Sequence, residues 1–248
     1  MEQGRSRKAV LRFDFPREVT LYRKVVHDRE QFETWWGSLD NASDAYMTVY
    51  GYRQLKEPNY KRCDYGSAVI PHFVLDFDCV VVERGERKDV DPSVPLGEVR
   101  LLHQHLMAEE ILHAIWFSGG GFHVWVKLDR DHLPFNGIDC SIIKNSGRAL
   151  VRGWADELGL KCIDPTVTFD LASLIRVPNS YNVKRERWCI PLRSEEICEW
   201  DWERITQKAT HHRSGFYSYG SSGVVLDLSE RHRVWEREME PVEIPTIN

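Results

Sequence analysis

Two aspartates two residues apart interrupt an apolar, β-prone stretch, Phe73-Val74-Leu75-Asp76-Phe77-Asp78. On a β-strand, residues i and i+2 point to the same face, so Asp76 and Asp78 are expected to project together. Two like charges on a mostly buried strand are unfavourable unless a positive group lies between them. Carboxylate oxygens suit Mg²⁺ or Mn²⁺, so the pair predicts a divalent metal site. Alternatively, both acids cap the end of the strand and pair with nearby Lys or Arg.

A second block of interest is Ser118-Gly119-Gly120-Gly121-Phe122-His123, which lies between two predicted strands. Glycine permits positive φ and lets the backbone approach a ligand closely. The successive amide groups of such a turn, from Gly119 to Gly121, can bind a phosphate, and Ser118 adds a hydroxyl. His123 begins the second strand and can donate a hydrogen bond to the same phosphate. A plain glycine-rich hairpin with a surface histidine is the alternative.

The third block runs from Cys162 to Asn182 and contains a further carboxylate, Asp164, at the end of a predicted strand. It also contains Arg176, an isolated arginine among apolar neighbours. Such an arginine is rarely buried without an anion, and a triphosphate would supply one. An internal Arg176–Asp170 ion pair is the alternative.

Composition places the chain among ordinary globular proteins and leaves its function open. Its 248 residues suffice for one large or two small domains, and the net charge of −5 neither indicates nor excludes a local basic groove. The six cysteines form no CxxC pair and are expected to be reduced. No apolar run reaches membrane-spanning length and no secretory signal is recognisable, so we expect a cytoplasmic protein without membrane contacts.

Elements of both kinds are expected to position these blocks. The N-terminal part predicts strands over Arg17–Val26 and Ala45–Arg53, and a helix after the N-cap residue Asp28. The central part predicts an exposed loop over Glu83–Gly97, a helix over Glu98–Ala114, and strands over Ile115–Phe117 and Phe122–Leu128. The last part predicts a helix over Ser141–Leu158 that Gly159 ends, a strand over Trp188–Leu192, a helix over Glu195–Arg204, and a weakly ordered tail beyond about Thr210.

Taken in this order, the acidic pair, the glycine turn and the segment IDPTVTFDLASLIRVPNS resemble the motifs of the archaeo-eukaryotic primase superfamily. The likeness covers about Phe73 to Lys184 and is greatest to the catalytic small subunit of archaeal and eukaryotic DNA primases. Asn182 stands where that subunit more often has histidine. In this respect the chain is more similar to plasmid and viral primase-polymerases.

The resemblance implies an α/β (α+β) fold, in which an RRM-like antiparallel sheet packs with an N-terminal α/β layer. The catalytic domain would span residues 1–205, with the N-terminal layer at about 10–70 and the RRM-like module at about 71–205. Residues 206–248 would form a polar C-terminal tail or extension.

The same resemblance implies a metal site. Asp76, Asp78 and Asp164 would bind two Mg²⁺ or Mn²⁺ ions about 4 Å apart, which activate a primer 3′-hydroxyl and stabilise the leaving pyrophosphate. Family small subunits often carry a Cys/His zinc knuckle between the first two motifs. Because Cys79–Phe117 contains no second cysteine, we expect no structural zinc.

A nucleotide site is implied as well, with Arg176 holding the triphosphate and Asp170 supporting Arg176. The residues implied to contact the nucleotide are Ser118, Gly119, Gly121, His123, Arg176, Ser180 and Asn182. The resemblance therefore implies that NTP or dNTP is the substrate.

Nucleic-acid binding must be argued from local charge, and Lys184, Arg185 and Arg187 with Trp188 combine cations with an aromatic ring. Such mixtures bind a phosphate backbone and stack bases, although a solvated charged loop is an equal alternative. A single-stranded DNA template is the expected partner. A large subunit or a helicase would be a separate chain, because no Walker-type segment is present.

The resulting hypothesis is template-directed nucleotidyl transfer that makes or extends short primers, carried out in a replication-associated cytoplasmic setting. A metal-dependent DxD glycosyltransferase would explain Asp76 and Asp78 but gives no role to the other two blocks. A non-catalytic RRM-like nucleic-acid-binding module would have no need of clustered carboxylates near phosphates.

Overall fold

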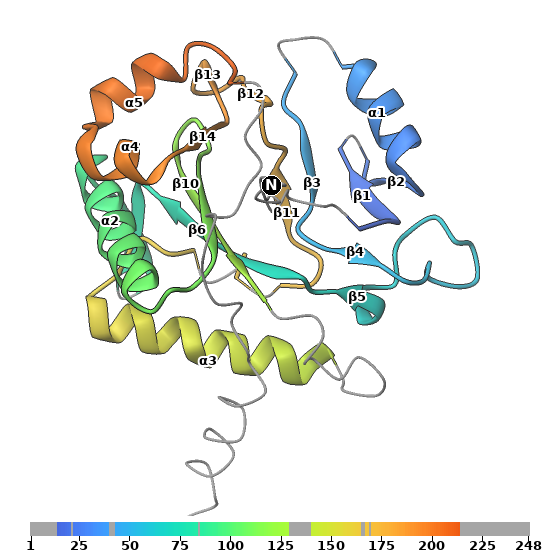
Figure 1. Cartoon of the computed structure of the whole chain (residues 1–248). Coiled ribbons are helices and arrows are strands. Elements are labelled where there is room, and N and C mark those ends of the chain that lie inside the picture. The colour runs from blue at the N-terminus through green and yellow to red at the C-terminus, as the bar shows by residue number, and fades with distance from the viewer. Residues whose placement is uncertain are drawn as a thin grey trace, which may run out of the picture.

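The computed structural model describes residues 14–20, 22–39, 43–83, 85–128, 140–164, 167–168 and 170–213. These residues form a mixed α+β fold with antiparallel sheets, which confirms the predicted fold class. Two of the sheets have four strands each (Figure 1). None of the described helices is both long enough and apolar enough to cross a membrane. Most of the predicted C-terminal tail, beyond Arg213, lies outside the described residues.

The first large sheet has the order β14-β9-β10-β6, and α2 and α3 cover one of its faces. The bounds are β6 His72–Asp78, β9 His113–Phe117, β10 Gly121–Lys127, β14 Ile190–Leu192, α2 Ser93–Ala108 and α3 Cys140–Leu158. Past α3, Ile163 forms an antiparallel bridge with Phe77 on the other edge of β6. With this segment counted as a short strand, the chain order is β-α-β-β-α-β and the spatial order is Ile163-β6-β10-β9. This is the RRM-like arrangement that the sequence predicts, extended by β14.

The second large sheet has the order β11-β3-β1-β2 and carries α1. The bounds are β1 Arg17–Val19, β2 Lys24–Val26, β3 Tyr46–Thr48, β11 Leu174–Arg176 and α1 Arg29–Gly37. Asp28 accepts a hydrogen bond from the Gln31 amide at 2.8 Å, which confirms it as the N-cap of α1. Figure 1 shows β11 beside β3, so the third sequence block crosses from the RRM-like part into the N-terminal sheet.

The smaller elements connect these two sheets and flank them. They are β4 Gly51–Tyr52, β5 Ala68–Val69, β7 Val80–Glu83, β8 Glu86–Asp89, β12 Tyr181–Asn182, β13 Arg187–Trp188, α4 Ser194–Glu199, α5 Trp202–Lys208 and a 3₁₀ turn at Tyr65–Ser67.

The two faces of β6 pack against different layers. Phe73 stacks on Trp154 of α3, with ring centroids 5.9 Å apart, so the odd-numbered positions face the helices. His72 lies between Trp125 of β10 and Tyr50 of the N-terminal part, at 4.6 Å and 6.3 Å. The even-numbered positions of β6, which include both predicted metal ligands, therefore face the N-terminal layer.

The prediction of two single N-terminal strands is wrong, because each is divided into two shorter strands. Arg17–Val26 is a hairpin of β1 and β2, because Tyr22 and Arg23 take left-handed backbone angles, with φ of 65° and 52°. The stretch Ala45–Arg53 bends after Thr48, so that β3 and β4 join different sheets. Neither turn contains the Gly or Pro that normally indicates one.

The predicted loop over Glu83–Gly97 and the helix over Glu98–Ala114 are also wrong in their bounds. The charged segment forms the β7–β8 hairpin and then the first turn of α2. The helix ends at Ala108 because Glu110, with φ of 55°, allows the Ile111 amide to reach the Leu106 carbonyl at 2.7 Å. The early end of the helix leaves His113 free to begin β9.

Predictions nearer the C-terminus hold in part. The hairpin of β9 and β10 is confirmed, and so is the end of α3 at Gly159, whose φ is 69°. The strand expected over Trp188–Leu192 is divided between β13 and β14. The helix expected over Glu195–Arg204 is two short helices, α4 and α5.

Gly121 has no room for a side chain, and this gives a stability prediction. It lies opposite Asp78 in the β6–β10 ladder, and a Cβ there would be 2.1 Å from the Phe77 carbonyl oxygen. Gly121→Ala should lower the free energy of unfolding by about 1–3 kcal/mol, measured by urea denaturation. Gly153→Ala is the control, because no atom lies within 4 Å of its Cβ position on α3. Equal unfolding midpoints for the two variants would contradict the packing described.

Candidate active site

A cavity of about 450 Å³ lies where β6 and β10 meet β3 and β11. Both layers of the fold contribute to it, and residues of all three sequence blocks line it. The lining residues are Asp44, Tyr46, Asp76, Asp78, Cys79, Val80, Ser118, Gly120, His123, Leu174, Ile175, Arg176, Asn182, Lys184 and Arg185. The three blocks therefore share one cavity, although the predicted site residues Asp164 and Gly121 are not among those that line it.

Backbone pairing places the three predicted metal ligands on neighbouring segments. Asp76 is the antiparallel partner of His123 on β10. On the other edge of β6, the Asp164 amide donates to the Asp76 carbonyl at 2.7 Å, and the Asp78 amide donates to the Cys162 carbonyl at 3.1 Å. Asp164 thus lies beside the pair although it is far along the chain from it.

Burial and neighbouring carboxylates raise the pKa of Asp76 and of Asp78. For Asp76 the main cause of a strongly raised pKa is burial, followed by the charges of Asp78 and Asp164, while Arg176 opposes the shift. Burial and the charge of Asp164 likewise raise the pKa of Asp78. A site that disfavours its own negative charges in this way favours a bound cation.

The donor set consists of hard oxygens, which suits Mg²⁺ or Mn²⁺. Among the residues that the structure describes, however, no three His, Cys, Asp or Glu side chains converge as a ready metal-binding group. The chemistry of these carboxylates thus fits a divalent cation, while their present side-chain positions do not yet enclose one.

His123 lies beside the acidic pair as a neutral side chain. Its Nε2 is 3.6 Å from Oδ1 of Asp76, but burial, and then Arg176, lowers the pKa of His123 to about 3. The two side chains therefore do not form an ion pair at neutral pH. A neutral imidazole in this position retains one N–H that can donate to an anion.

Arg176 extends into the same cavity from β11 and is almost fully buried. Its Nη1 donates to Asp44 Oδ1 at 2.6 Å and to the Tyr181 carbonyl at 2.9 Å. Its Nη2 donates to the Tyr46 hydroxyl, and the guanidinium lies 4.5 Å from the centre of the Tyr46 ring. Asp44 is thus the carboxylate partner of Arg176.

The expected link between Arg176 and Asp170 is wrong. Asp170 instead accepts hydrogen bonds from the Ser173 hydroxyl at 2.8 Å and the Ala172 amide at 3.3 Å, so it stabilises its own turn. Asp44 has the supporting role that the sequence interpretation gave to Asp170. Only the register of β3 against β11 shows this, because Tyr46 is the antiparallel partner of Arg176.

The glycine turn is held in shape by two of the predicted nucleotide-binding residues. Ser118 Oγ accepts a hydrogen bond from the Gly121 amide at 3.1 Å, and Asn182 Nδ2 donates to the Ser118 carbonyl at 3.2 Å. Gly119 has a φ of 93°, and a Cβ there would lie 2.8 Å from the Asn182 Cβ. Ser118 and Asn182 therefore fix the backbone that faces the cavity.

The remaining predicted residues differ in whether they line the cavity. Ser180 is buried, with its hydroxyl 3.5 Å from the Ala45 carbonyl, and does not line it. Lys184 and Arg185 are exposed on its rim. Arg187 and Gly119 line an adjoining cavity of about 360 Å³, which shares Arg185 with the first. Trp188 packs edge-on against Tyr181, at 5.3 Å.

Comparison with known proteins gives likeness to solved structures alone. No family model matches the sequence, and no curated protein matches it. Among solved structures, the chain is similar to the polymerase domain from Mycobacterium tuberculosis Ligase D in complex with DNA, with 11% identity and a TM-score of 0.48. The match covers 90% of this chain and 71% of that one. What the site can do therefore follows from this chain's own residues.

The raised pKa of Asp76 predicts an unusual effect of its removal. A carboxyl whose pKa is higher in the folded than in the unfolded state loses stability as pH rises above the unfolded value. In metal-free protein, Asp76→Asn should therefore increase the free energy of unfolding at pH 7, by about 0.5–2 kcal/mol, the range of common stabilising mutations. The gain should shrink toward pH 4, where the unfolded carboxyl also becomes protonated.

Urea denaturation between pH 4 and pH 8 measures this effect. Asp156→Asn, at an exposed position of α3, is the control and should change stability little at any pH. If Asp76→Asn is destabilising at pH 7, the repulsion described for the acidic group is not present.

Proposed function

We propose that the chain is a nucleotidyltransferase of the archaeo-eukaryotic primase type. It would make or extend short primers on single-stranded DNA by template-directed transfer from NTP or dNTP. The observation that carries this proposal is the single cavity that gathers residues of all three motif blocks, with Asp76 and Asp78 on β6, the glycine turn and His123 on β10, and Arg176 on β11. A shared cleft is what the motif resemblance requires.

In this proposal Asp76, Asp78 and Asp164 hold divalent metal. Support comes from the raised pKa values of Asp76 and Asp78, to which neighbouring carboxylates contribute and which a cation would lower. When bound, Mg²⁺ or Mn²⁺ activates the primer 3′-hydroxyl and stabilises the leaving pyrophosphate. Backbone pairing on one edge of β6 places the segment of Asp164 beside that of Asp76 and Asp78, and the side chains would turn toward a bound metal.

The nucleotide would bind on the side of Arg176. Its guanidinium neutralises phosphate charge, and neutral His123 donates a hydrogen bond without competing for the metal as a cation. The Ser118 and Gly121 amides bond within the turn, so the amides of Gly119 and Gly120 would be those that bind the phosphates. Ser180 acts indirectly in this proposal, because it keeps the segment after β11 in place.

Single-stranded DNA would reach the site along the basic rim. Lys184 and Arg185 line the main cavity, and Arg185 also lines the adjoining one with Arg187. These basic side chains next to the acidic group would bind the phosphates of a strand whose end reacts there.

Primer synthesis tests the proposal directly. Labelled nucleotides, single-stranded DNA and Mg²⁺ or Mn²⁺ are incubated with and without a pre-annealed primer. The wild type should give metal-dependent products, and Asp76→Ala/Asp78→Ala should lower the yield on the order of 10²-fold or more, as loss of electrostatic stabilisation does. Asp156→Ala, at the exposed α3 position, should keep full activity.

The parallel reactions also separate the alternatives. Products only with the primer mean extension without initiation. Turnover of a nucleotide-sugar without any template would support a glycosyltransferase, and binding of single strands without metal-dependent incorporation would support a non-catalytic module. Either of the last two results would overturn the proposal.

Asp44 gives a second prediction, because it holds the arginine that the triphosphate needs. The Asp44 side chain is 41% exposed, so it can leave Arg176 when a nucleotide enters. Asp44→Asn removes both the competing charge and its repulsion of phosphates. It should tighten nucleotide binding by about three- to tenfold, or about 0.7–1.4 kcal/mol, measured by isothermal titration calorimetry. Asp170→Asn is the matched control and should leave the affinity unchanged. A weaker affinity for Asp44→Asn would mean that Asp44 positions Arg176 instead of competing for it.

A further inference from the structure

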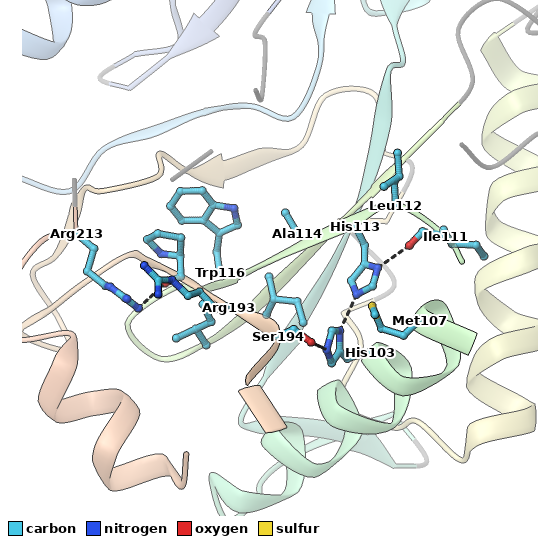
Figure 2. Close-up of a pocket in the computed structure, with 13 residues that line it drawn as sticks. His103, Met107, Ile111, Leu112, His113, Ala114, Trp116, Arg193, Ser194 and Arg213 are labelled. Carbon is cyan, nitrogen blue, oxygen red and sulfur yellow. Dashed lines mark hydrogen bonds between the residues drawn. The ribbon is translucent and has the colours of Figure 1, made fainter. Parts of the chain in front are cut away.

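A second cavity, of about 220 Å³, lies at the β9–β14 side of the RRM-like sheet and shares no lining residue with the candidate active site. Figure 2 shows its polar group, in which Ser194 of α4, His103 of α2 and His113 of β9 form a chain. The other side chains that line it are largely apolar and include Met107, Ile111 and Trp116. None of these residues has a role in the proposed nucleotidyl transfer.

The chain of hydrogen bonds is short at every link. Ser194 Oγ is 2.7 Å from His103 Nε2, and His103 Nδ1 is 2.7 Å from His113 Nε2. His113 Nδ1 is in turn 2.7 Å from the Ile111 carbonyl oxygen. His103 and His113 are buried, whereas Ser194 is exposed at the mouth of the cavity.

The last partner determines the direction of all these bonds. A carbonyl oxygen only accepts, so His113 Nδ1 must carry the proton. In a neutral imidazole the other nitrogen is then an acceptor, so His103 Nδ1 donates to His113 Nε2. By the same rule His103 Nε2 is an acceptor, and the Ser194 hydroxyl must donate to it. The fold thus orients the serine proton toward an unprotonated imidazole nitrogen.

We propose that Ser194 is a nucleophile and that this cavity hydrolyses small carboxylic esters. His103 is the general base, and His113 positions its ring and tautomer. A nucleophile within hydrogen-bond reach of a base, which a third group orients, is the arrangement that activates serine. This activity is separate from the proposed nucleotidyl transfer.

The reaction balances with water as the co-reactant. Ser194 Oγ forms a bond to the ester carbonyl carbon while its proton moves to His103 Nε2. The ester C–O bond then breaks, and the leaving alcohol takes that proton. Water, deprotonated by the same nitrogen, attacks the acyl-serine, and the proton returns to Ser194 as the acid is released.

The lining of the cavity selects the substrate class. Apolar side chains such as Met107 and Ile111 suit a short acyl chain, and the small volume excludes a long one. Arg193 and Arg213 also line the cavity, and Arg213 is fixed by two bonds to Glu196, at 2.7 Å and 2.8 Å. The charge of Arg213 is thus paired with Glu196, and Arg193 is the other cationic side chain of the lining.

The low basicity of His103 gives the activity a characteristic pH profile. Burial, and then His113, lowers the pKa of His103 to about 4, while Glu195 opposes the shift. His103 is therefore unprotonated above about pH 5, and the rate should not vary from there to pH 8. Turnover should be slow, because a weak base removes the serine proton less effectively.

Covalent labelling of the full chain tests the proposal. A fluorophosphonate probe is added, and the labelled residue is located and its rate measured by mass spectrometry, with p-nitrophenyl acetate hydrolysis in parallel. Ser93 is the internal control, because its exposed hydroxyl donates to a carboxylate, Asp91, at 2.6 Å and contacts no imidazole in the structure. Ser194 should be labelled at least about tenfold faster than Ser93, and Ser194→Ala should abolish both the label and the added hydrolysis.

The histidine variants separate a base from a structural support. His103→Gln should slow labelling of Ser194 on the order of 10²-fold at an unchanged melting temperature. His113→Asn should raise the pH above which the rate becomes constant, because His113 no longer lowers the pKa of His103. If either variant fails to fold, the labelling rates of Ser194 and Ser93 in the wild type still test the proposal. Equal labelling of the two serines, or hydrolysis that persists in Ser194→Ala, would overturn the proposal.

Discussion

The backbone pairing at the end of β6 is the constraint on which the rest of the site depends. One edge of this strand pairs with β10 and the other with the segment that ends at Asp164, so main-chain hydrogen bonds hold together the backbone segments that carry the three acids. The ladder is so close at Gly121 that no side chain fits there. Side-chain repulsion cannot separate these acids, because the strands that carry them are part of the core. Burial and mutual repulsion therefore appear as raised pKa values instead of as a rearranged structure.

The cationic side of the site comes from the other sheet. The chain leaves Asp164 in the RRM-like part and returns as β11 beside β3, which brings Arg176 to the cavity from the opposite wall. Arg176 lowers the pKa of Asp76 and also that of His123, so one guanidinium adjusts both neighbours. Its present partners are Tyr46 of β3 and Asp44, which lies two residues before that strand. The cavity between the two sheets is thus also where Arg176 faces the carboxylates of β6.

The sequence predicted those features that local chemistry determines. Alternating residues with two acids predicted β6 and the shared face of Asp76 and Asp78, and glycine predicted the β9–β10 turn and the end of α3. Turns made by other residues were missed, because the residue types of Glu110 and Tyr22 do not indicate a left-handed backbone. Asp44 and Tyr46 were missed for a different reason. Their role depends on the register of two strands that lie far apart in the chain, and neither residue forms a motif with Arg176.

The polar groups of the two cavities differ in how they are satisfied. The charged forms of Asp76 and Asp78 are disfavoured, so binding of a cation or a proton to them stabilises the folded protein. The chain from Ser194 to the Ile111 carbonyl is neutral, and each of its donors has an acceptor at 2.7 Å. Such a network is stable without any ligand. It changes only when the serine oxygen forms a bond to an electrophile. Because the two groups lie on different sides of β9 and β10 and share no lining residue, metal or nucleotide at one cavity should leave the proton relay at the other unchanged.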